Sequence, residues 1–284
     1  MTALVSVLPL LRWSLFWLLA VFCGFAAKAG ASTQSQFILG IGYGQYSSVL
    51  HAQPNRSFNL LPRWQIYYDR FYMENLDLGF NLLETQHWSV DLTTKQSFDA
   101  LLTRGGGLRD SLLTGLVSTS KPILLPIGHG NSLSDIITPA KRHFSYLGGA
   151  TVLYRRADWQ FSSSVHQDIS NVHQGNEWQN SLSYRWQQPG FGVELTGSIR
   201  RLDHNYSRYY LGVLPGDFTR NAYQYAPGSQ WLPSVKVALR LQLTSQMDFV
   251  ANWRREYLPS ASLNSLYFAT LNQDLWFSGV TLRW

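Results

Sequence analysis

Four polar residues at alternate positions have the types that a hydrolase site needs. Ser162, Ser164, His166 and Asp168 would supply a nucleophile, a base and an acid on one face of one strand. Same-face neighbours on a strand stand about 7 Å apart, whereas a nucleophile and its base must approach to about 3 Å. A triad would therefore need partners from adjacent strands. We interpret the four residues as polar lining of a lumen.

The sequence shows no other spacing typical of a catalytic, cofactor or metal site. The histidines, at positions 51, 87, 129, 143, 166, 173 and 204, lack metal-ligand spacing and a cysteine partner. The glycines in 104–107 do not open a helix after a strand, as a phosphate-binding loop requires. We predict no catalytic residue, no cofactor and no metal, and a protein that is not an enzyme.

Segment after segment beyond residue 31 alternates in hydropathy with a period of two, the period of a β-strand. The clearest examples lie at 159–168, 181–187, 191–200 and 234–244. Each has one apolar and one polar face, and no segment shows a convincing helical period. The sequence therefore predicts an all-β fold.

Aromatic residues decide between a soluble sandwich and a membrane barrel. Trp178 and Trp186 lie near the two ends of one apolar face, and Trp253 and Tyr257 lie on another. Aromatic girdles at both ends of lipid-facing strands are typical of transmembrane barrels. Because an open sheet edge would leave unpaired backbone groups in hydrocarbon, we predict a closed transmembrane antiparallel β-barrel with a polar interior.

The links between strands predict their number. We expect periplasmic turns at the short links 84–87, 156–158, 188–190 and 244–246. We expect extracellular loops at the longer polar links near 46–57, 99–143, 168–177, 202–232 and 259–273. Tyr68-Asp69-Arg70 could be a further turn, but the alternation keeps one phase from 64 to 82, which favours one long strand. Because bacterial single-chain barrels have even strand numbers, we predict ten strands, with twelve as the alternative.

The first residues read as a secretory signal peptide. Arg12 precedes an apolar run at 13–27, and Ala27-Lys28-Ala29 matches an A-x-A cleavage site. We predict a signal peptide at 1–29, with cleavage after residue 31 as the alternative, and a barrel domain at 30–284. Removing 1–29 lowers the net charge from +6 to +4, because Arg12 and Lys28 leave with no acidic residue. This mild excess predicts no nucleic-acid partner.

The link at 99–143 contains apolar stretches at 112–117 and 122–127, which an exposed loop would not keep in water without cover. It could fold inward as a plug or cap the rim and meet a partner, and a weakly ordered surface loop is the third alternative. The pairs Arg200-Arg201 and Arg254-Arg255 lie near the predicted outer ends of strands. They could bind the phosphates of lipopolysaccharide, with outer-membrane lipid around the barrel, or form a solvated rim.

The last predicted strand places Trp276, Val280, Leu282 and Trp284 on one face. A terminal aromatic residue preceded by alternating hydrophobic residues resembles the signal read by the outer-membrane assembly machinery. We therefore expect this strand to close against the first one, near 37–43, and the protein to reside in the outer membrane of a Gram-negative cell.

The segment containing Tyr209, Tyr210, Gly212 and Val213 reads YYLGV and is followed by Arg220 and a short turn at 226–228. Together with 61–71, 79–83 and the closing strand, it resembles the MltA-interacting protein (MipA/OmpV) family of outer-membrane proteins. The resemblance covers most of the chain after the signal peptide.

The resemblance implies a non-enzymatic outer-membrane scaffold for peptidoglycan enzymes, with a lytic transglycosylase and a murein synthase as partners and no catalytic residues. A narrow solute channel is the alternative, because the predicted lumen holds both signs of charge at Lys236 and Arg240, Glu194 and Arg200, and Asp248 and Glu256.

Overall fold

The computed structural model describes residues 33–51, 55–102, 142–215, 217, 224–265 and 267–284. The strands are β1 (Thr33–Tyr46), β2 (Arg56–Tyr68), β3 (Phe71–Glu74), β4 (Asp77–Glu84), β5 (Trp88–Gln96), β6 (Tyr146–Arg156), β7 (Trp159–Asp168), β8 (Asn176–Gln188), β9 (Phe191–Leu202), β10 (Gln230–Gln242), β11 (Met247–Tyr257) and β12 (Asn272–Arg283). Between strands lie the 3-10 helices η2 (Asp99–Leu102) and η4 (Ser260–Ser265) and the helix α3 (His204–Leu211).

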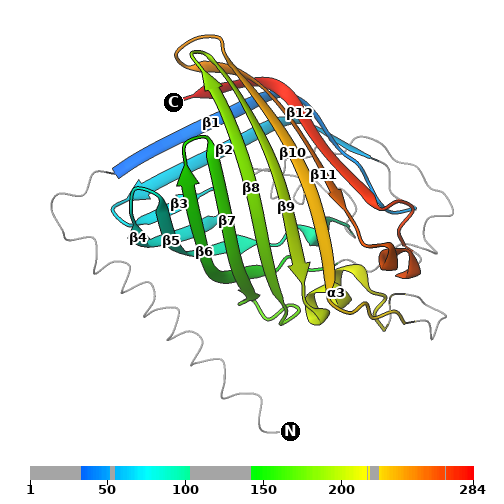
Figure 1. Cartoon of the computed structure of the whole chain (residues 1–284). Helices are drawn as coiled ribbons and strands as arrows, with labels where there is room; N and C mark the ends of the chain where they lie inside the picture. Colours follow the sequence, from blue (N-terminus) through cyan, green and yellow to red (C-terminus); the bar gives the residue numbers. More distant parts are fainter. Residues whose placement is uncertain (1–32, 52–54, 103–141, 216, 218–223, 266) are drawn as a thin grey trace, which may run out of the picture.

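The twelve strands form one closed barrel in which each strand pairs with its sequence neighbours (Figure 1). The pairings are antiparallel, and β1 closes the barrel against β12 from Ile38 opposite Arg283 to Tyr46 opposite Leu275. The expected partnership of the first and last strands is therefore confirmed. Closure gives each strand a ladder partner on both sides over at least part of its length, and β2 pairs with β3 only at Gln65–Tyr68.

The outer surface of the barrel is an apolar band. Large exposed hydrophobic residues occupy alternate positions on the strands, including Ile41, Leu92, Val165, Leu182, Leu195 and Leu241. Trp88, Trp159, Trp178, Trp186 and Trp231 stand exposed nearer the strand ends. An outward apolar face with aromatic residues toward its rims is the surface that lipid covers, so the barrel is a transmembrane one. Among the described residues, none of the helices has the length and hydropathy needed to cross a bilayer.

The prediction of ten strands is wrong, and the alternative of twelve is right. The segment expected to be one long strand is three strands, β2, β3 and β4, joined by tight turns at 69–70 and 75–76. A two-residue turn pairs the residues on either side of it on the same face, as for Tyr68 with Phe71 and Glu74 with Asp77. Each turn therefore shifts the alternation of outward-facing and inward-facing positions by one residue, and the second turn restores the original alternation. The phase at 64–82 looked continuous for this reason.

Both turns begin with a residue that tolerates the left-handed backbone region. Asp69 has φ of 52° and Asn75 has φ of 57°, and Asp and Asn adopt this region more readily than other non-glycine residues. Asn75 is also buried, and its Oδ1 accepts a hydrogen bond from the Trp64 backbone N–H at 3.0 Å. This side chain holds the β3–β4 hairpin against β2.

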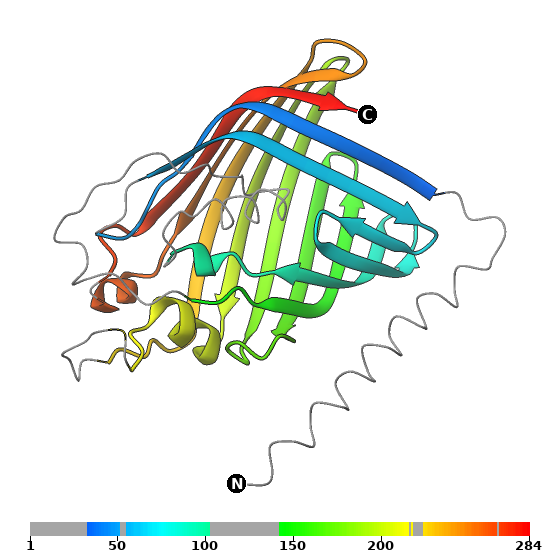
Figure 2. The same ribbon diagram turned by 180° about the vertical axis from the view of Figure 1, so that it is seen from behind.

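The two ends of the barrel differ. The predicted turns at 84–87, 156–158, 188–190 and 244–246 all lie at one end with the turn at 69–70, and we call this the short-turn end. The end of β12 lies there too, since the Arg283 N–H donates to the carbonyl of Gln246 at 3.0 Å. The five predicted long links lie at the opposite, long-loop end, seen with α3 in Figures 1 and 2. The predicted signal peptide and residues 103–141 of the predicted loop or plug lie outside the described residues.

Glycines permit close packing at the seam between β1 and β12. A Cβ on Gly42 would lie 2.2 Å from the Ser278 carbonyl oxygen, and one on Gly279 would lie 2.4 Å from the Ile41 carbonyl oxygen. These backbone atoms cannot move without disturbing the ladder that closes the barrel. The seam therefore depends on the absence of side chains at these two positions.

We expect Gly42→Ala to impair closure of the barrel, because its methyl group overlaps the backbone of β12. A forced clash of this kind costs about 1–3 kcal/mol. The matched control is Gly197→Ala on β9, where an added Cβ meets nothing within 4 Å. The measurement is the urea midpoint of unfolding in lipid vesicles. Equal midpoints for the two variants would contradict the assignment of the seam.

Candidate functional site: a capped and charged lumen

The four residues that raised the hydrolase hypothesis all face the lumen but do not converge. The His166 ring bonds Thr93 through Nε2 at 2.8 Å, and the hydroxyls of Ser162 and Ser181 bond each other at 2.9 Å. The interpretation as polar lining is confirmed for these side chains. Within the described residues, no group of three or more His, Cys, Asp or Glu side chains is arranged to hold a metal ion.

Asp168 organises the link between β7 and β8. Its carboxylate accepts hydrogen bonds from the backbone N–H groups of Ser170, Val172, His173 and Gln174 at 2.7 to 2.9 Å. A carboxylate that accepts four such bonds is fully engaged in a turn. Asp168 therefore has a structural role at the long-loop end.

Six charged side chains, four of them buried, form a cluster in the lumen near the long-loop end. They are Lys95, Asp99, Glu177, Arg200, Arg254 and Glu256, from five different elements. Arg200 lies at the centre and contacts Asp99 at 3.0 Å, Glu177 at 3.2 Å and Glu256 at 2.6 Å. Lys95 pairs with Glu177, and Arg254 pairs with Glu256. Three positive and three negative charges thus neutralise one another, as buried charges must.

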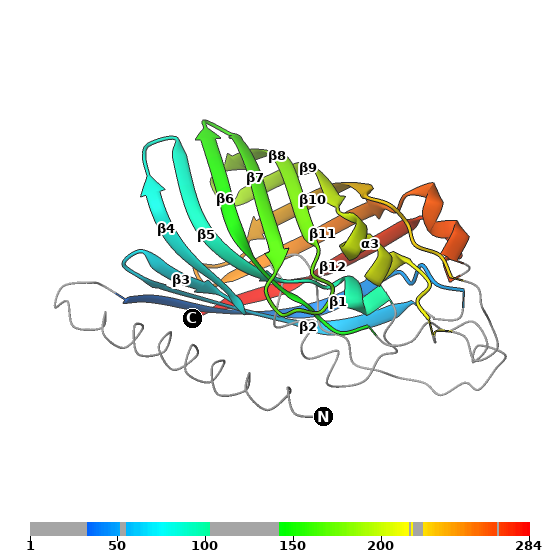
Figure 3. The ribbon, with the colours of Figure 1, turned by 90° about the horizontal axis from the view of Figure 1, so that it is seen from below.

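The charge cluster joins the wall to a cap that lies across the long-loop end. Asp99 belongs to η2, and it also accepts a 2.7 Å hydrogen bond from the hydroxyl of Tyr206 on α3. The cap has its own hydrophobic core, in which Val49, Ala100, Tyr206, Tyr210, Leu258 and Phe268 are buried together. These residues come from four links around the barrel, and Figure 3 shows α3 beyond the strand ends. The links thus form one packed structure over the lumen.

The family-signature residues lie in this cap. Tyr210 and Val213 are buried in its core, and the Tyr209 hydroxyl accepts a 2.9 Å hydrogen bond from the backbone N–H of His143. Gly212 ends α3 where a Cβ would lie 2.4 Å from the Arg208 carbonyl oxygen. The Gly212 carbonyl in turn accepts from Arg142 at 3.3 Å. The YYLGV segment therefore builds the cap.

Arg142 adds a second buried ion pair to the cap. Its two Nη atoms contact the Asp217 carboxylate at 2.8 and 2.6 Å in a bidentate arrangement. Burial alone would raise the pKa of Asp217, but hydrogen bonds from Arg142 and the Leu214 N–H lower it overall. The pair therefore stays ionised and ties the segment that precedes β6 to the link after α3.

His173, in the β7–β8 link, is buried against the cap tyrosines, with its ring 4.5 Å from that of Tyr206. Its Nδ1 accepts a hydrogen bond from the Gly175 N–H at 2.9 Å, so Nε2 must carry the proton that it shares with Ser145 Oγ at 3.0 Å. Burial lowers the pKa of His173 below its ordinary value of 6.5, although nearby acidic groups oppose this. The neutral ring is therefore a fixed part of the cap.

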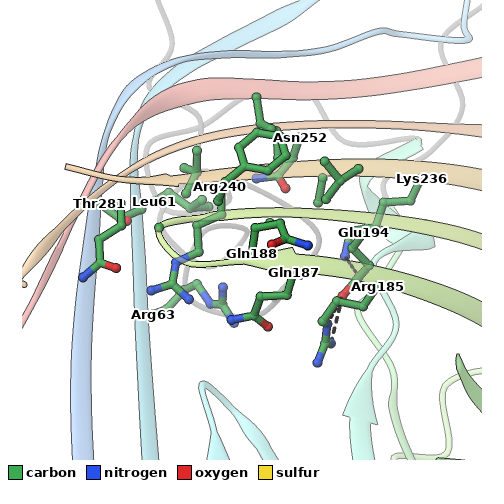
Figure 4. Close-up of a pocket in the computed structure, with 18 residues that line it drawn as sticks. Leu61, Arg63, Arg185, Gln187, Gln188, Glu194, Lys236, Arg240, Asn252 and Thr281 are labelled. Atoms are coloured by element: carbon green, nitrogen blue, oxygen red, sulfur yellow. Dashed lines mark hydrogen bonds and ion pairs between the residues drawn. The ribbon is translucent and has the colours of Figure 1, made fainter. Parts of the chain in front are cut away.

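A cavity of about 420 Å³ lies in the lumen toward the short-turn end (Figure 4). Its charged lining consists of Arg63, Arg185, Glu194, Lys236 and Arg240, and the amides of Gln187, Gln188, Gln242 and Asn252 also line it. Glu194 pairs with Arg185 at 2.9 Å and with Lys236 at 3.2 Å. The expected lumen positions of Lys236, Arg240 and Glu194 are confirmed.

The two dibasic pairs divide between the faces of the wall. Arg200 and Arg254 belong to the lumen cluster, so they cannot meet lipopolysaccharide. Arg201 lies on the other face of β9, 6.0 Å from the Trp231 ring, and Arg255 binds Asp274 at 2.8 Å. One arginine of each pair is thus left at the outer rim.

The predicted assembly-signal residues occupy the outer face of β12. Trp284 is 63% exposed and lies 5.7 Å from the Phe37 ring, and Trp276 lies 5.4 Å from Tyr43 across the seam. Val280 and Leu282 stand opposite Ile41 and Leu39 of β1. This face is continuous with the lipid-facing surface of the first strand.

Sequence reasoning missed Lys95, Asp99 and Glu177 as members of the lumen cluster, and it missed Tyr206 as the cap residue that binds Asp99. Each lies in a different element, and they meet only through the curvature of the barrel. The sequence signal was an acidic or basic residue on the polar face of a strand. Such residues predict a charged lumen, but they do not predict which side chains form ion pairs.

The family described as MltA-interacting protein MipA matches residues 39–284 of the chain. No curated protein matches the chain. Among solved structures, the porin NanC aligns with 10% identity over 87% of this chain and 98% of its own, with a TM-score of 0.39. A bacterial polysaccharide outer-membrane secretin aligns with 9% identity over 88% and 98%, with a TM-score of 0.42. The barrel is defined by its own strand pairing.

We expect mild acidification to loosen the cap through His173. Its pKa is lower in the folded state, so the unfolded state binds more protons as pH falls below about 6.5, and stability is lost in that direction. The loss is at most about 1.4 kcal/mol per pH unit for one group. Hydrogen exchange of residues 203–215 between pH 7.5 and 5.5 measures it. In His173→Gln this pH dependence should flatten, whereas His87→Gln in a short turn should leave it unchanged. An unchanged pH dependence in His173→Gln would refute the assignment.

Proposed function

Because the chain belongs to the MltA-interacting protein MipA family, we propose that it is a non-enzymatic outer-membrane scaffold for peptidoglycan enzymes. Its partners in this proposal are a lytic transglycosylase, MltA in the family description, and a murein synthase. The observation that carries the proposal is the family match over 39–284, which includes the wall and the cap. A further support is that the lumen residues with reactive side chains are held in ion pairs and turns.

In this proposal residues 1–29, or 1–31, are a signal peptide that directs export. The outer face of β12, with Trp276, Val280, Leu282 and Trp284, is read by the assembly machinery during insertion. The short-turn end then faces the periplasm and the cap faces the outside. The outward arginines Arg201 and Arg255 lie at the outer rim, where lipopolysaccharide phosphates would meet them.

The scaffold surface is expected at the short-turn end, because peptidoglycan enzymes work on the periplasmic side. Basic and polar residues are exposed there on neighbouring turns, including Arg155, Arg156 and Asp158. The β4–β5 and β6–β7 turns are joined by a hydrogen bond from the Arg155 N–H to the His87 carbonyl at 2.7 Å. Turns fixed in this way present a constant surface without long loops.

Site-specific crosslinking in intact envelopes tests this surface. A photoreactive residue at Gln86 or Ser245, both exposed in short turns, should capture a lytic transglycosylase or a murein synthase. The matched control is Leu263 in η4, which is exposed at the opposite end. The scaffold proposal is refuted if the barrel is present at normal levels and the short-turn positions capture neither enzyme.

A narrow solute channel remains the second candidate, and the observation that favours it is the polar cavity in the lumen. The cap opposes it, because buried contacts from four links lie across the path. We therefore expect little or no conductance from the unmodified protein in planar bilayers. Tyr206→Ala, which removes a buried ring and the bond to Asp99, should raise the frequency of open events. Steady conductance by the unmodified barrel would favour the channel.

A further inference from the structure

The charges of the lumen are balanced beneath the cap but not in the cavity. The cluster around Arg200 contains equal numbers of acids and bases. The cavity is lined by four basic side chains and one acidic side chain, Glu194, which already binds Arg185 and Lys236. The excess of positive charge therefore belongs to Arg63 and in part to Arg240, whose partner Asp248 is shared with Arg283.

Arg63 and Arg240 keep unused donors. Among the described residues, the Nε of Arg63 is buried without a hydrogen-bond partner. Arg240 contacts Asp248 through Nε at 3.0 Å, and Asp248 is shared with Arg283 at 2.8 Å. Among the described residues, the Nη atoms of Arg240 are thus left free, and they lie toward the cavity. Figure 4 shows the side chains of Arg63 and Arg240 there with Gln187.

Two guanidinium groups that line one cavity repel each other more strongly when low-dielectric walls replace water. Each guanidinium also has a planar set of N–H donors that matches a carboxylate or a phosphate with two parallel hydrogen bonds. An anion between them removes the repulsion and satisfies the free donors at once. The neighbouring glutamine amides can donate to further oxygens of the same ligand.

We propose that this cavity binds a small anion bearing two or more carboxylate or phosphate groups. The anion would contact Arg63 and Arg240, with Gln187 and Gln242 as further donors. A volume of about 420 Å³ is within the range of small-molecule sites. It is ample for a ligand with two or three such groups.

The ligand would enter from the short-turn end. The side chains of Arg185 and Arg240 at the cavity are 57% and 48% exposed to solvent. At the opposite end the cap and the neutral charge cluster separate the cavity from the outside. In the proposed orientation the site therefore samples periplasmic solutes, and it does not depend on whether a murein enzyme docks.

Isothermal titration of the full-length barrel in nonionic detergent tests the site with two probes, citrate and pyrophosphate, at constant ionic strength. At least one should bind, and the tighter one identifies carboxylate or phosphate as the preferred group. Arg63→Gln and Arg240→Gln should each weaken binding about tenfold or more, because each removes charge-assisted hydrogen bonds. Acetate, with one carboxylate, should bind at least tenfold more weakly than citrate.

The matched control is Arg201→Gln, which removes an arginine from the outer face of β9. It should leave the affinity unchanged, and urea unfolding midpoints would verify that all variants are folded. Arg240→Lys supplies a second variant that keeps the charge and loses the planar donor set. The proposal is overturned if neither probe binds at millimolar concentration, or if Arg201→Gln weakens binding as much as Arg63→Gln. Because no murein enzyme is present, this result is independent of the scaffold proposal.

Discussion

The pairing of β1 with β12 is the constraint on which the rest of the structure depends. In hydrocarbon an unpaired backbone N–H or C=O costs several kcal/mol, so a sheet with two free edges could not remain in the membrane. The ladder from Ile38 to Tyr46 removes both edges. It requires Gly42 and Gly279 to lie backbone to backbone. Once the ladder forms, alternate residues of every strand are assigned to lipid or to the lumen.

Closure of the wall creates the second requirement, which is to satisfy the polar groups turned inward. Near the long-loop end this is done by mutual pairing, with Arg200 bound to three carboxylates from η2, β8 and β11. Removing one member of such a buried set leaves an uncompensated charge, at a cost of about 3–5 kcal/mol. One of the three carboxylates, that of Asp99, belongs to the cap. The cap is therefore held by the same interactions that neutralise the lumen.

The sequence predicted most of the wall because alternation, turn residues and aromatic girdles are local signals. The five long links and four of the short turns were found, and the lumen-facing sides of β7, β9 and β10 were assigned correctly. The strand count failed at β3, a strand of four residues between two tight turns, because the two shifts of phase cancel. The residue that marks the second turn is Asn75, whose left-handed backbone is visible only in the structure.

The charge cluster was beyond sequence reasoning for a different reason. Arg200 was predicted to face the lumen, but its partner Glu177 and the neighbouring Lys95 were not, because their pairing depends on strand register and on the position of η2. Register in turn depends on turns such as 75–76, where the prediction had failed. The YYLGV segment was recognised by resemblance, but its role in the cap follows from the burial of Tyr210 and Val213.

The coupling of cap and wall favours one end of the barrel as the functional one. Lifting the cap would separate Asp99 from Arg200 and expose the shared core around Tyr206. Among the described residues, no comparable seal covers the short-turn end, where the side chains of Arg185 and Arg240 are open to solvent. A barrel that is closed by buried ion pairs on one side and basic and open on the other is suited to contacts on the open side. Both the scaffold surface and the anion cavity lie on that side.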